Sequence, residues 1–415
     1  MRRILLILII LGLAGGAVWY FVLRTRGTPT EQPSGGFKEF FSFGGENNEN
    51  TDQNQIPLPN EQIIPSATSS SFKQITALPV AGYTVFSQTK TITTPPSTPN
   101  GKPGVQTIIE NIIRYVSRQS GFVYEIKNET APLQISNIFI PAIYEAYFAD
   151  NNTTAILRFI KDGTNTIGTY SVPIPSENPD GTRTQKEGAF LLDNTLGIAI
   201  SPDTKEVVKL NVEQTQGVFT IASSLDKNKK EILRTPLKEW SISWPQKGSI
   251  YAQTKPAGIV EGFLYKIDTT EKRLRRVIGN VKGLTASVSP NGSFVLYSET
   301  TKDGFITKIM NTKTGSIKNT NLAILPEKCV WLKSEDLICA GNTDVPAGVY
   351  PDAWYAGLVS FSDQIFRIYT ANNIFDVLYS NNEESFDMTS LQADENRGLL
   401  FFIDKKTGLL WSFTL

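Results

Sequence analysis

The fold is decided by the stretch Ser289-Pro290-Asn291-Gly292-Ser293-Phe294-Val295-Leu296-Tyr297-Ser298, a tight turn that runs into an apolar strand. Proline presets φ at the first corner of such a turn, asparagine tolerates the second corner, and glycine adopts the positive φ that follows. A second apolar strand, Leu284-Thr285-Ala286-Ser287-Val288, comes directly before the turn. Because both flanking segments are short and rich in aromatic or β-branched residues, the stretch predicts a β-hairpin.

This turn recurs along the chain at a fixed spacing. Turns of the same kind begin at Ser201, Pro245, Ser289 and Lys333, each 44 residues after the one before. A period near 44 residues, with short strands on both sides of each turn, is typical of a β-propeller whose blades have four strands. One segment, Val105 to Val116, could be helical by its pattern, but it is short and rich in β-branched residues. We therefore predict an all-β propeller of four-stranded blades.

Seven blades are favoured, and six or eight are the alternatives. The expected blades are residues 76–139, 140–187, 188–238, 239–281, 282–325, 326–385 and 386–415. The last segment supplies only about three strands, so we expect a strand from the other end of the domain to complete the sheet and remove an exposed edge. The candidate is Gln74-Ile75-Thr76-Ala77-Leu78. The predicted propeller thus occupies residues 72–415 and closes by pairing its N- and C-terminal strands.

Several of these motifs resemble known propeller families. Residues 289–298 resemble the blade signature of TolB-like and other WD-repeat-like propellers, and residues 404–411 are similar to the repeat of PQQ-type propellers. The whole layout also resembles uncharacterised membrane-anchored propeller proteins of candidate-phyla bacteria, including the segments at 325–331 and 352–355. These resemblances imply a propeller fold and bring no activity with them.

The amino terminus has the pattern of a membrane anchor. An apolar run from Ile4 to Leu23 follows two arginines and is closed by Arg24 and Arg26. At 1.5 Å per residue this run is about 30 Å long, which matches the hydrocarbon thickness of a bilayer. A cleaved signal peptide is the alternative, but the apolar run continues well beyond the small residues at 14–17. We predict a single transmembrane helix within residues 1–26.

The next segment, residues 27–71, is rich in Gly, Pro, Ser, Asn, Gln and Glu. Such a composition cannot bury enough apolar surface to offset the entropy of ordering, so we expect a flexible polar stalk. Anchor and stalk together predict a single-pass protein of the cell membrane whose C-terminal domain lies outside the cytoplasm.

Composition excludes much of the common catalytic chemistry. The chain has no histidine and two cysteines, so catalytic triads with histidine, histidine-ligated metals and four-cysteine zinc or iron-sulfur sites are ruled out. It has 40 basic and 40 acidic residues, and four arginines lie in residues 1–26, which leaves a net charge of −4 on the rest. That balance argues against nucleic acid as a partner. No cofactor and no metal site is predicted.

One blade is longer than the others. From Leu332 to the equivalent Gln392 the step is 60 residues, about 16 more than the period, and the excess falls in the segment from Gly341 to Gly357. This segment holds the candidate binding residues Tyr350, Asp352, Trp354 and Tyr355. Aromatic side chains on a long loop of a rigid β scaffold suit contacts with a protein or a glycan. The alternative is a loop that folds over the mouth of the propeller as a lid or filler.

Carboxylates and cysteines give two further predictions. Asp363, a candidate binding residue, and Asp376 could join Asp352 in a carboxylate pair of the kind that glycosidases use. Cys329 and Cys339 lie five residues on either side of the turn at Ser334, which places them on adjacent strands. A disulfide is expected in an oxidising compartment, and two buried thiols are expected otherwise.

Two classes of function follow. The first is a membrane-tethered, surface-exposed propeller that acts as a non-catalytic binding or scaffold module for a protein or glycan partner of the cell envelope. The alternative is a carboxylate-dependent hydrolase or lyase acting on an envelope polysaccharide. We favour the first because it explains the stalk, the absence of histidine and the aromatic insertion together.

Overall fold

The computed structural model describes residues 71–94, 104–178, 182–343, 345–380 and 384–415. The chain divides into two units, Met1–Pro59 and Asn60–Leu415. The predicted anchor at 1–26 lies outside the described residues, and so does the predicted stalk up to residue 70. Within the described part of the chain, no helix combines the length and the apolar character that crossing a bilayer requires.

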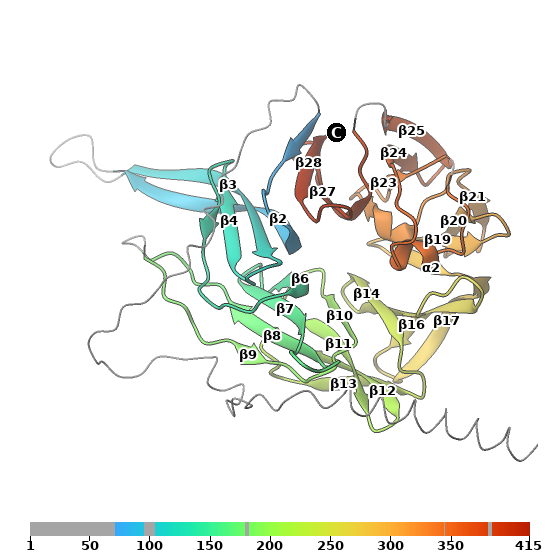
Figure 1. The fold of residues 1–415 in the computed structure, drawn as a ribbon, viewed down its shortest axis with the longest axis horizontal. Coiled ribbons are helices and arrows are strands. Elements are labelled where there is room, and N and C mark those ends of the chain that lie inside the picture. The colour runs from blue at the N-terminus through green and yellow to red at the C-terminus, as the bar shows by residue number, and fades with distance from the viewer. Residues whose placement is uncertain (1–70, 95–103, 179–181, 344, 381–383) are drawn as a thin grey trace, which may run out of the picture. The chain divides into compact units, whose positions relative to one another are not determined.

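Seven antiparallel sheets of four strands make up the described part of the larger unit, which confirms the predicted all-β propeller of seven blades (Figure 1). Blade 1 has β2 (Val80–Thr94), β3 (Gly104–Ser117), β4 (Val123–Lys127) and β5 (Leu133–Gln134); blade 2 has β6 (Ile143–Ala149), β7 (Thr154–Ile160), β8 (Ile167–Pro173) and β9 (Ala189–Phe190); blade 3 has β10 (Gly197–Ile200), β11 (Val207–Glu213), β12 (Gln216–Ala222) and β13 (Lys230–Thr235). Blade 4 has β14 (Trp240–Gln246), β15 (Ser249–Thr254), β16 (Glu261–Asp268) and β17 (Arg273–Lys282); blade 5 has β18 (Thr285–Val288), β19 (Phe294–Thr300), β20 (Phe305–Asn311) and β21 (Ile317–Asn319). Blade 6 has β22 (Cys329–Trp331), β23 (Leu337–Gly341), β24 (Gln364–Tyr369) and β25 (Ile374–Tyr379); blade 7 has β26 (Met388–Asp394), β27 (Leu399–Asp404), β28 (Leu410–Thr414) and β1 (Phe72–Gln74).

The first strands of the blades surround the centre of the propeller. Strand β2 lies beside β6, β6 beside β10, β10 beside β14, β14 beside β18, β22 beside β26, and β26 beside β2. The short 3-10 helix η1 (Pro326–Lys328), which leads into β22, lies beside β18 and β26. Where β2 passes β6, Gly82 is required, because a Cβ added there would lie 2.1 Å from the carbonyl oxygen of Ala146.

The ring closes through blade 7, whose outermost strand comes from the N-terminal end of the domain. Strand β1 pairs antiparallel with β28, Phe72 opposite Phe413 and Gln74 opposite Trp411. The predicted closing segment, residues 74–78, therefore overlaps the observed strand only at Gln74. The register follows from packing: the Phe72 ring is buried and lies 4.8 Å from the Phe413 ring and 4.9 Å from the Phe386 ring.

The turns with the 44-residue period join the first and second strands of blades 3 to 6. Their polar side chains cap the backbone: Ser289 Oγ accepts a hydrogen bond from the Phe294 amide at 3.0 Å. Equivalent positions also contact each other between blades, since the Asn291 amide donates to Glu335 Oε1 at 3.2 Å. The repeat in the sequence thus corresponds to contacts between neighbouring blades.

The apolar core lies between the faces of adjacent blades. In one cluster Phe219 of blade 3 packs against Trp240 and Ile250 of blade 4, with the Phe219 and Trp240 rings 6.1 Å apart. In another, Leu296 of blade 5 packs with Phe366 of blade 6. In these clusters the strands meet the neighbouring blade through apolar faces, which fixes the register of the sheets and gives a rigid scaffold for the loops.

Candidate functional site

The long connection of blade 6 runs between β23 and β24, and we call residues 342–363 the insertion. It contains α2 (Asp352–Tyr355), a single helical turn. The predicted insertion of Gly341 to Gly357 falls almost entirely within it. Tyr350 is fully buried, and its ring lies 4.9 Å from Phe305 and 5.9 Å from Phe361. Trp354 is also buried and stacks on Phe361 at 6.2 Å. These two aromatic rings form a small core under the insertion and leave no ring surface for a partner.

Polar contacts tie the insertion to blades 4 and 5. A carboxylate oxygen of Asp352 accepts a hydrogen bond from the Gly258 amide, and the Tyr350 carbonyl accepts one from the Thr300 hydroxyl. The exposed Tyr355 donates its hydroxyl to Glu327. Of the predicted binding residues on this segment, only Asp352 and Tyr355 are exposed, and both already have a partner within the chain.

A fully buried ion cluster lies beneath α2. We call Lys328, Asp363 and Asp387 the buried triad. Lys328 Nζ lies 2.8 Å from Asp363 Oδ2 and 2.6 Å from Asp387 Oδ1, and the three side chains are 1%, 0% and 0% exposed. The Lys328 ammonium also lies 5.1 Å from the centre of the Trp354 ring. Because the triad joins η1, the end of the insertion and the start of β26, it fixes the insertion to blades 6 and 7.

The two carboxylates of the triad differ in their surroundings. Asp387 accepts hydrogen bonds from Trp354 Nε1 at 3.0 Å, from the Ser360 hydroxyl at 3.0 Å and from the Phe361 amide at 3.1 Å. Burial acts to raise its pKa, but the Lys328 charge and these donors outweigh burial and hold the pKa below its ordinary value. For Asp363, burial is the larger effect and raises the pKa to about 6 despite the Lys328 charge.

The structure does not bring the predicted carboxylates Asp352, Asp363 and Asp376 into one site. Asp363 is closed inside the triad, Asp352 faces blade 4, and Asp376 lies on β25, the outermost strand of blade 6, where it accepts the Tyr369 hydroxyl at 2.9 Å. Asp376 is exposed and Asp363 is buried, so the two carboxylates do not line a common cavity.

The two cysteines lie directly opposite each other in β22 and β23. They are joined by a disulfide with an S–S distance of 2.10 Å and a Cα–Cα distance of 4.1 Å. The disulfide links β22, which directly follows η1, to β23, which leads into the insertion.

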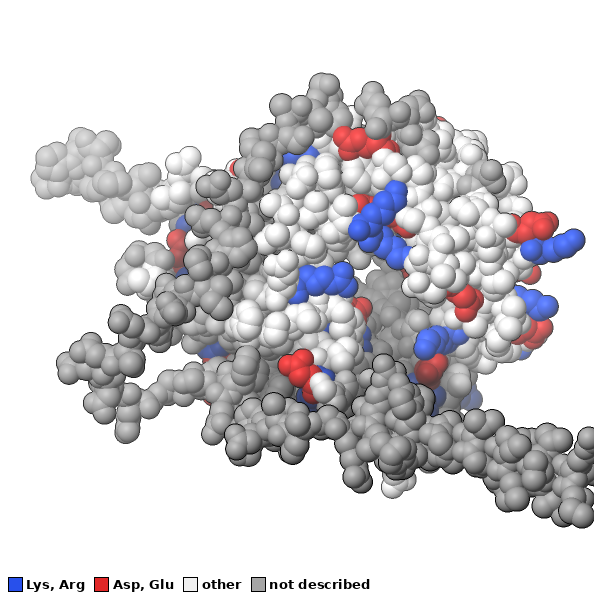
Figure 2. All heavy atoms as spheres, viewed as in Figure 1, with Lys and Arg blue, Asp and Glu red and all other residues white. Residues whose placement is uncertain are grey.

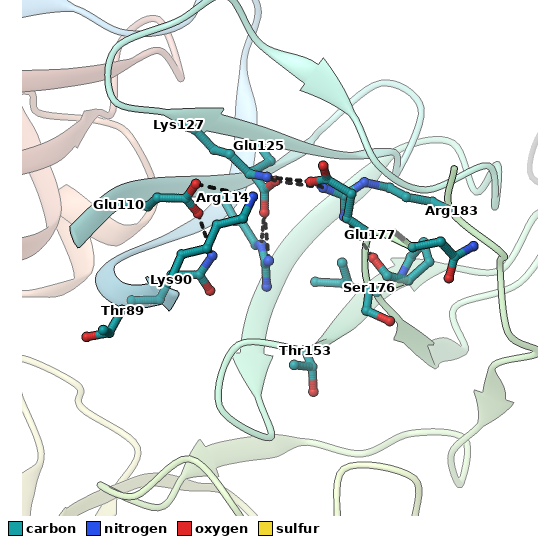
Figure 3. A pocket seen from close by; sticks show the side chains of 14 residues that line it. Thr89, Lys90, Glu110, Arg114, Glu125, Lys127, Thr153, Ser176, Glu177 and Arg183 are labelled. Atoms are coloured by element: carbon teal, nitrogen blue, oxygen red, sulfur yellow. Dashed lines mark hydrogen bonds and ion pairs between the residues drawn. The ribbon is translucent and has the colours of Figure 1, made fainter. Parts of the chain in front are cut away.

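A polar cavity of about 560 Å³ lies between blades 1 and 2, and we call it the blade 1–2 cavity (Figure 3). One wall comes from β2 and β3, the base from β3 and β4, and the opposite wall from the connection between β8 and β9. The charged side chains around it are four cations, Lys90, Arg114, Lys127 and Arg183, and three carboxylates, Glu110, Glu125 and Glu177.

Glu125 is the centre of this charge arrangement. Its Oε2 accepts a hydrogen bond from Arg114 Nε at 2.8 Å and lies 2.6 Å from Arg114 Nη2. Its Oε1 lies 3.0 Å from Arg183 Nη2 and 3.5 Å from Lys127 Nζ. Lys127 also lies 2.7 Å from Glu177. Sequence reasoning missed this cavity. Arg114 and Glu125 lie opposite each other in one hairpin, so the hairpin pattern could have predicted their pairing. Arg183 comes from another blade, and nothing local in the sequence predicts its contact with Glu125.

An apolar groove of about 600 Å³ lies between the end of blade 3 and blade 4. Trp240, Phe263 and Tyr265 line it, and the exposed aliphatic side chains of Leu237 and Val260 border it. On the face of the propeller seen in Figure 2, Lys and Arg are interspersed with Asp and Glu, and neither sign forms a continuous patch.

The fold and these sites define a seven-bladed β-propeller protein. No protein-family model and no curated protein matches the chain. Solved structures similar to it include TolB from Acinetobacter baumannii, with 11% identity over 73% of this chain and 81% of that chain and a TM-score of 0.40. They also include an oligogalacturonate lyase in complex with manganese, at 12% identity over 74% and 86% with a TM-score of 0.46. A third is the Cps50 (Swd1) β-propeller domain of Myceliophteria thermophila, at 9% identity over 73% and 93% with a TM-score of 0.45.

Proposed function

We propose that the chain is a membrane-tethered, non-catalytic binding or scaffold module that presents its propeller outside the cytoplasm to a protein or glycan of the cell envelope. The apolar run at 4–23 supplies the tether, and the polar segment at 27–71 supplies the distance from the bilayer. The seven blades supply a rigid support for the surfaces that recognise the partner.

The observation that carries this proposal is the commitment of the candidate acids to internal contacts. A general acid or base has to reach the proton it transfers. Asp363 has a pKa of about 6, a range that suits acid catalysis, but its side chain is 0% exposed and is paired with Lys328. In the blade 1–2 cavity, Glu125 is likewise occupied by Arg114 and Arg183. Because Asp363 and Glu125 are paired with basic side chains of the chain itself, they stabilise the fold, and a binding role is favoured over a catalytic one.

Two surfaces of the described residues that could meet a partner are the blade 1–2 cavity and the apolar groove. The cavity offers charged and hydroxyl groups, and the groove offers aromatic and aliphatic side chains. Both lie at junctions between blades, where side chains from two sheets meet. Ligand sites are commonly formed in concave regions of this size.

The test uses the full chain in its native cells, with a proximity-labelling enzyme fused after Leu415. Protease added to intact cells is expected to remove the propeller and leave the anchor protected. Labelling is expected to give a reproducible envelope partner. The matched control carries the labelling enzyme after residue 71, so that it keeps the anchor and stalk but lacks the propeller. A propeller that resists external protease until the cells are broken contradicts the topology, and identical labelling by the two fusions contradicts the binding role.

A further inference from the structure

We propose that the blade 1–2 cavity binds a saccharide unit that carries one negative charge. This assignment rests on the binding role proposed above and names the class of ligand for one of its surfaces. The observation that carries it is a group of three cations and two carboxylates in a cavity whose other lining residues are mostly polar, with several hydroxyl- and amide-bearing side chains.

The charge at the base of the cavity is unbalanced. Arg114, Lys127 and Arg183 share the two carboxylates of Glu125 and Glu177, which leaves one positive charge in excess. The fourth cation, Lys90, lies 3.6 Å from Glu110, so that pair adds no net charge. A partly enclosed site strengthens the attraction between charges compared with open water. A ligand with one negative charge therefore balances the cavity.

Glu125 fixes the positions of the cations. Its side chain is only 1% exposed, and both of its oxygens are occupied by basic partners. Arg114 is held further because it donates to the Asn152 carbonyl, and Arg183 because its Nη1 donates to the Pro175 carbonyl at 2.8 Å. The cationic base is therefore preorganised before any ligand arrives, which reduces the entropy lost on binding.

Lys127 is the cation best placed to meet an anion. Its ammonium has three N–H donors, whereas the described residues place two carboxylates near it, Glu177 at 2.7 Å and Glu125 at 3.5 Å. Burial acts to lower the pKa of Lys127, but these two glutamates outweigh burial and raise the pKa, so the ammonium stays charged at neutral pH. In Figure 3 the Lys127 ammonium lies between the carboxylates of Glu125 and Glu177.

The remaining walls indicate a polyol. Thr89, Thr153, Ser176 and Asn178 line the cavity, and each of these side chains both donates and accepts hydrogen bonds. Sugar hydroxyls have the same dual character. Aliphatic contact is limited to Ile174 and Pro175, and no aromatic ring is among the described residues that line the cavity. Recognition would therefore depend on hydrogen bonds and charge, not on ring stacking.

The size and charge argue against other anions. A cavity of about 560 Å³ accommodates a small ligand or a few sugar units, but not a nucleic-acid duplex. A phosphate monoester brings nearly two negative charges at neutral pH, one more than the cavity balances. A carboxylate or a sulfate ester brings one.

The test is a glycan array probed with the full-length chain in detergent micelles at low salt. The array carries uronic-acid, sialic-acid and monosulfated oligosaccharides together with their uncharged counterparts, and calorimetry then measures the best binders. We expect at least one monoanionic class to bind about tenfold more tightly than its uncharged counterpart, and we expect added NaCl to weaken that binding. Equal binding of charged and uncharged probes, or no binding to any probe, overturns the assignment.

Variants locate the binding in this cavity. Lys127→Gln should weaken binding of the monoanionic probe about tenfold. Lys90→Gln removes a side chain that is about half exposed, so it should fold normally and weaken binding to a smaller extent. Glu177→Gln has the opposite expectation: it raises the excess charge from one to two, and should strengthen binding and admit phosphorylated sugars. The matched control, Lys161→Gln, breaks the pair with Asp193 outside the cavity and should leave binding unchanged. Unchanged binding in both Lys127→Gln and Glu177→Gln refutes the site.

The two proposals fail in different ways. If labelling finds a partner that depends on the propeller but no acidic glycan binds, the binding role stands and this ligand class is wrong. If acidic glycans bind but external protease does not reach the propeller, the site stands and the topology is wrong.

Discussion

Replacing Lys328 by methionine should destabilise the propeller strongly, because the substitution keeps the volume of the side chain and removes the only cation within salt-bridge distance of Asp363 and Asp387 in the described part of the chain. The ammonium lies 2.8 Å and 2.6 Å from the two carboxylates, and none of the three side chains is more than 1% exposed. The variant leaves buried negative charge without compensation. Breaking buried pairs in this way costs about 3–5 kcal/mol.

The same magnitude follows from protonation. A buried carboxylate that has lost its cation can become neutral by taking up a proton. For Asp387, whose pKa in the native protein lies below its ordinary value of 3.8, this costs about 4 kcal/mol at pH 7 and about 2 kcal/mol at pH 5, at 1.36 kcal/mol per pH unit. Asp363 adds less, because its pKa is already raised in the native protein. The loss of unfolding free energy in Lys328→Met should therefore be about 4 kcal/mol at pH 7 and about half of that at pH 5.

The assay is urea denaturation at both pH values, with hydrogen exchange of the insertion as a local readout. Lys161→Met is the matched control, because its pair with Asp193 is partly exposed and should be worth less than about 1 kcal/mol at either pH. Adding Asp363→Asn to Lys328→Met should recover part of the loss, since one carboxylate no longer needs a proton. If Lys328→Met is no less stable than Lys161→Met, or its loss is the same at pH 5 and pH 7, the reasoning is refuted.

Three further predictions concern the scaffold. Because the pKa of Asp363 is raised in the folded state, the native protein binds more protons than the unfolded chain between about pH 4 and pH 6. The contribution of Asp363 to the unfolding free energy should therefore fall by about 3 kcal/mol as the pH rises from about 4 to above 6, and Asp363→Asn should remove that dependence from denaturation curves. Gly82→Ala should lower the unfolding free energy by about 1–3 kcal/mol, because its Cβ meets the Ala146 carbonyl, and an unchanged thermal midpoint would contradict the close approach of β2 and β6. Val377→Lys, on the exposed apolar edge strand β25, should leave stability unchanged and reduce concentration-dependent association in sedimentation experiments, whereas the same change at Ile317 on the three-residue strand β21 should not.

The repeat could be predicted because the chemistry that produces it is local. A turn with proline, Asx and glycine specifies its own backbone conformation, and the two-residue period of the flanking strands is visible within a few consecutive residues. The extra length of blade 6 was visible for the same reason, as a break in the period. The segment Val105 to Val116 belongs to β3, so its β-branched residues decided its structure over its helical pattern.

Contacts between distant parts of the chain could not be predicted in this way. The closing strand was placed two residues too late, because its register depends on how the Phe72 ring fits among rings of blade 7. Tyr350 and Trp354 were candidates for contact with a partner, with a lid or filler over the propeller mouth as the alternative, and the sequence left both open because an aromatic side chain in a loop has the same sequence signal whether it packs inward or outward. Lys328 and Asp387 are 59 residues apart, and no pattern in the sequence relates them.

Two of the ion clusters among the described residues, the buried triad and the cluster around Glu125, show why exposure, and not residue type, separates structure from recognition. In both, lysine or arginine side chains meet acidic side chains at the junction of two blades. The buried triad is closed to solvent and carries more negative than positive charge, so an added anion can neither enter nor gain from entering. The cluster around Glu125 borders an open cavity and carries more positive than negative charge. A ligand in this cavity would meet cations that Glu125 already holds in position. The search for a partner should therefore begin between blades 1 and 2.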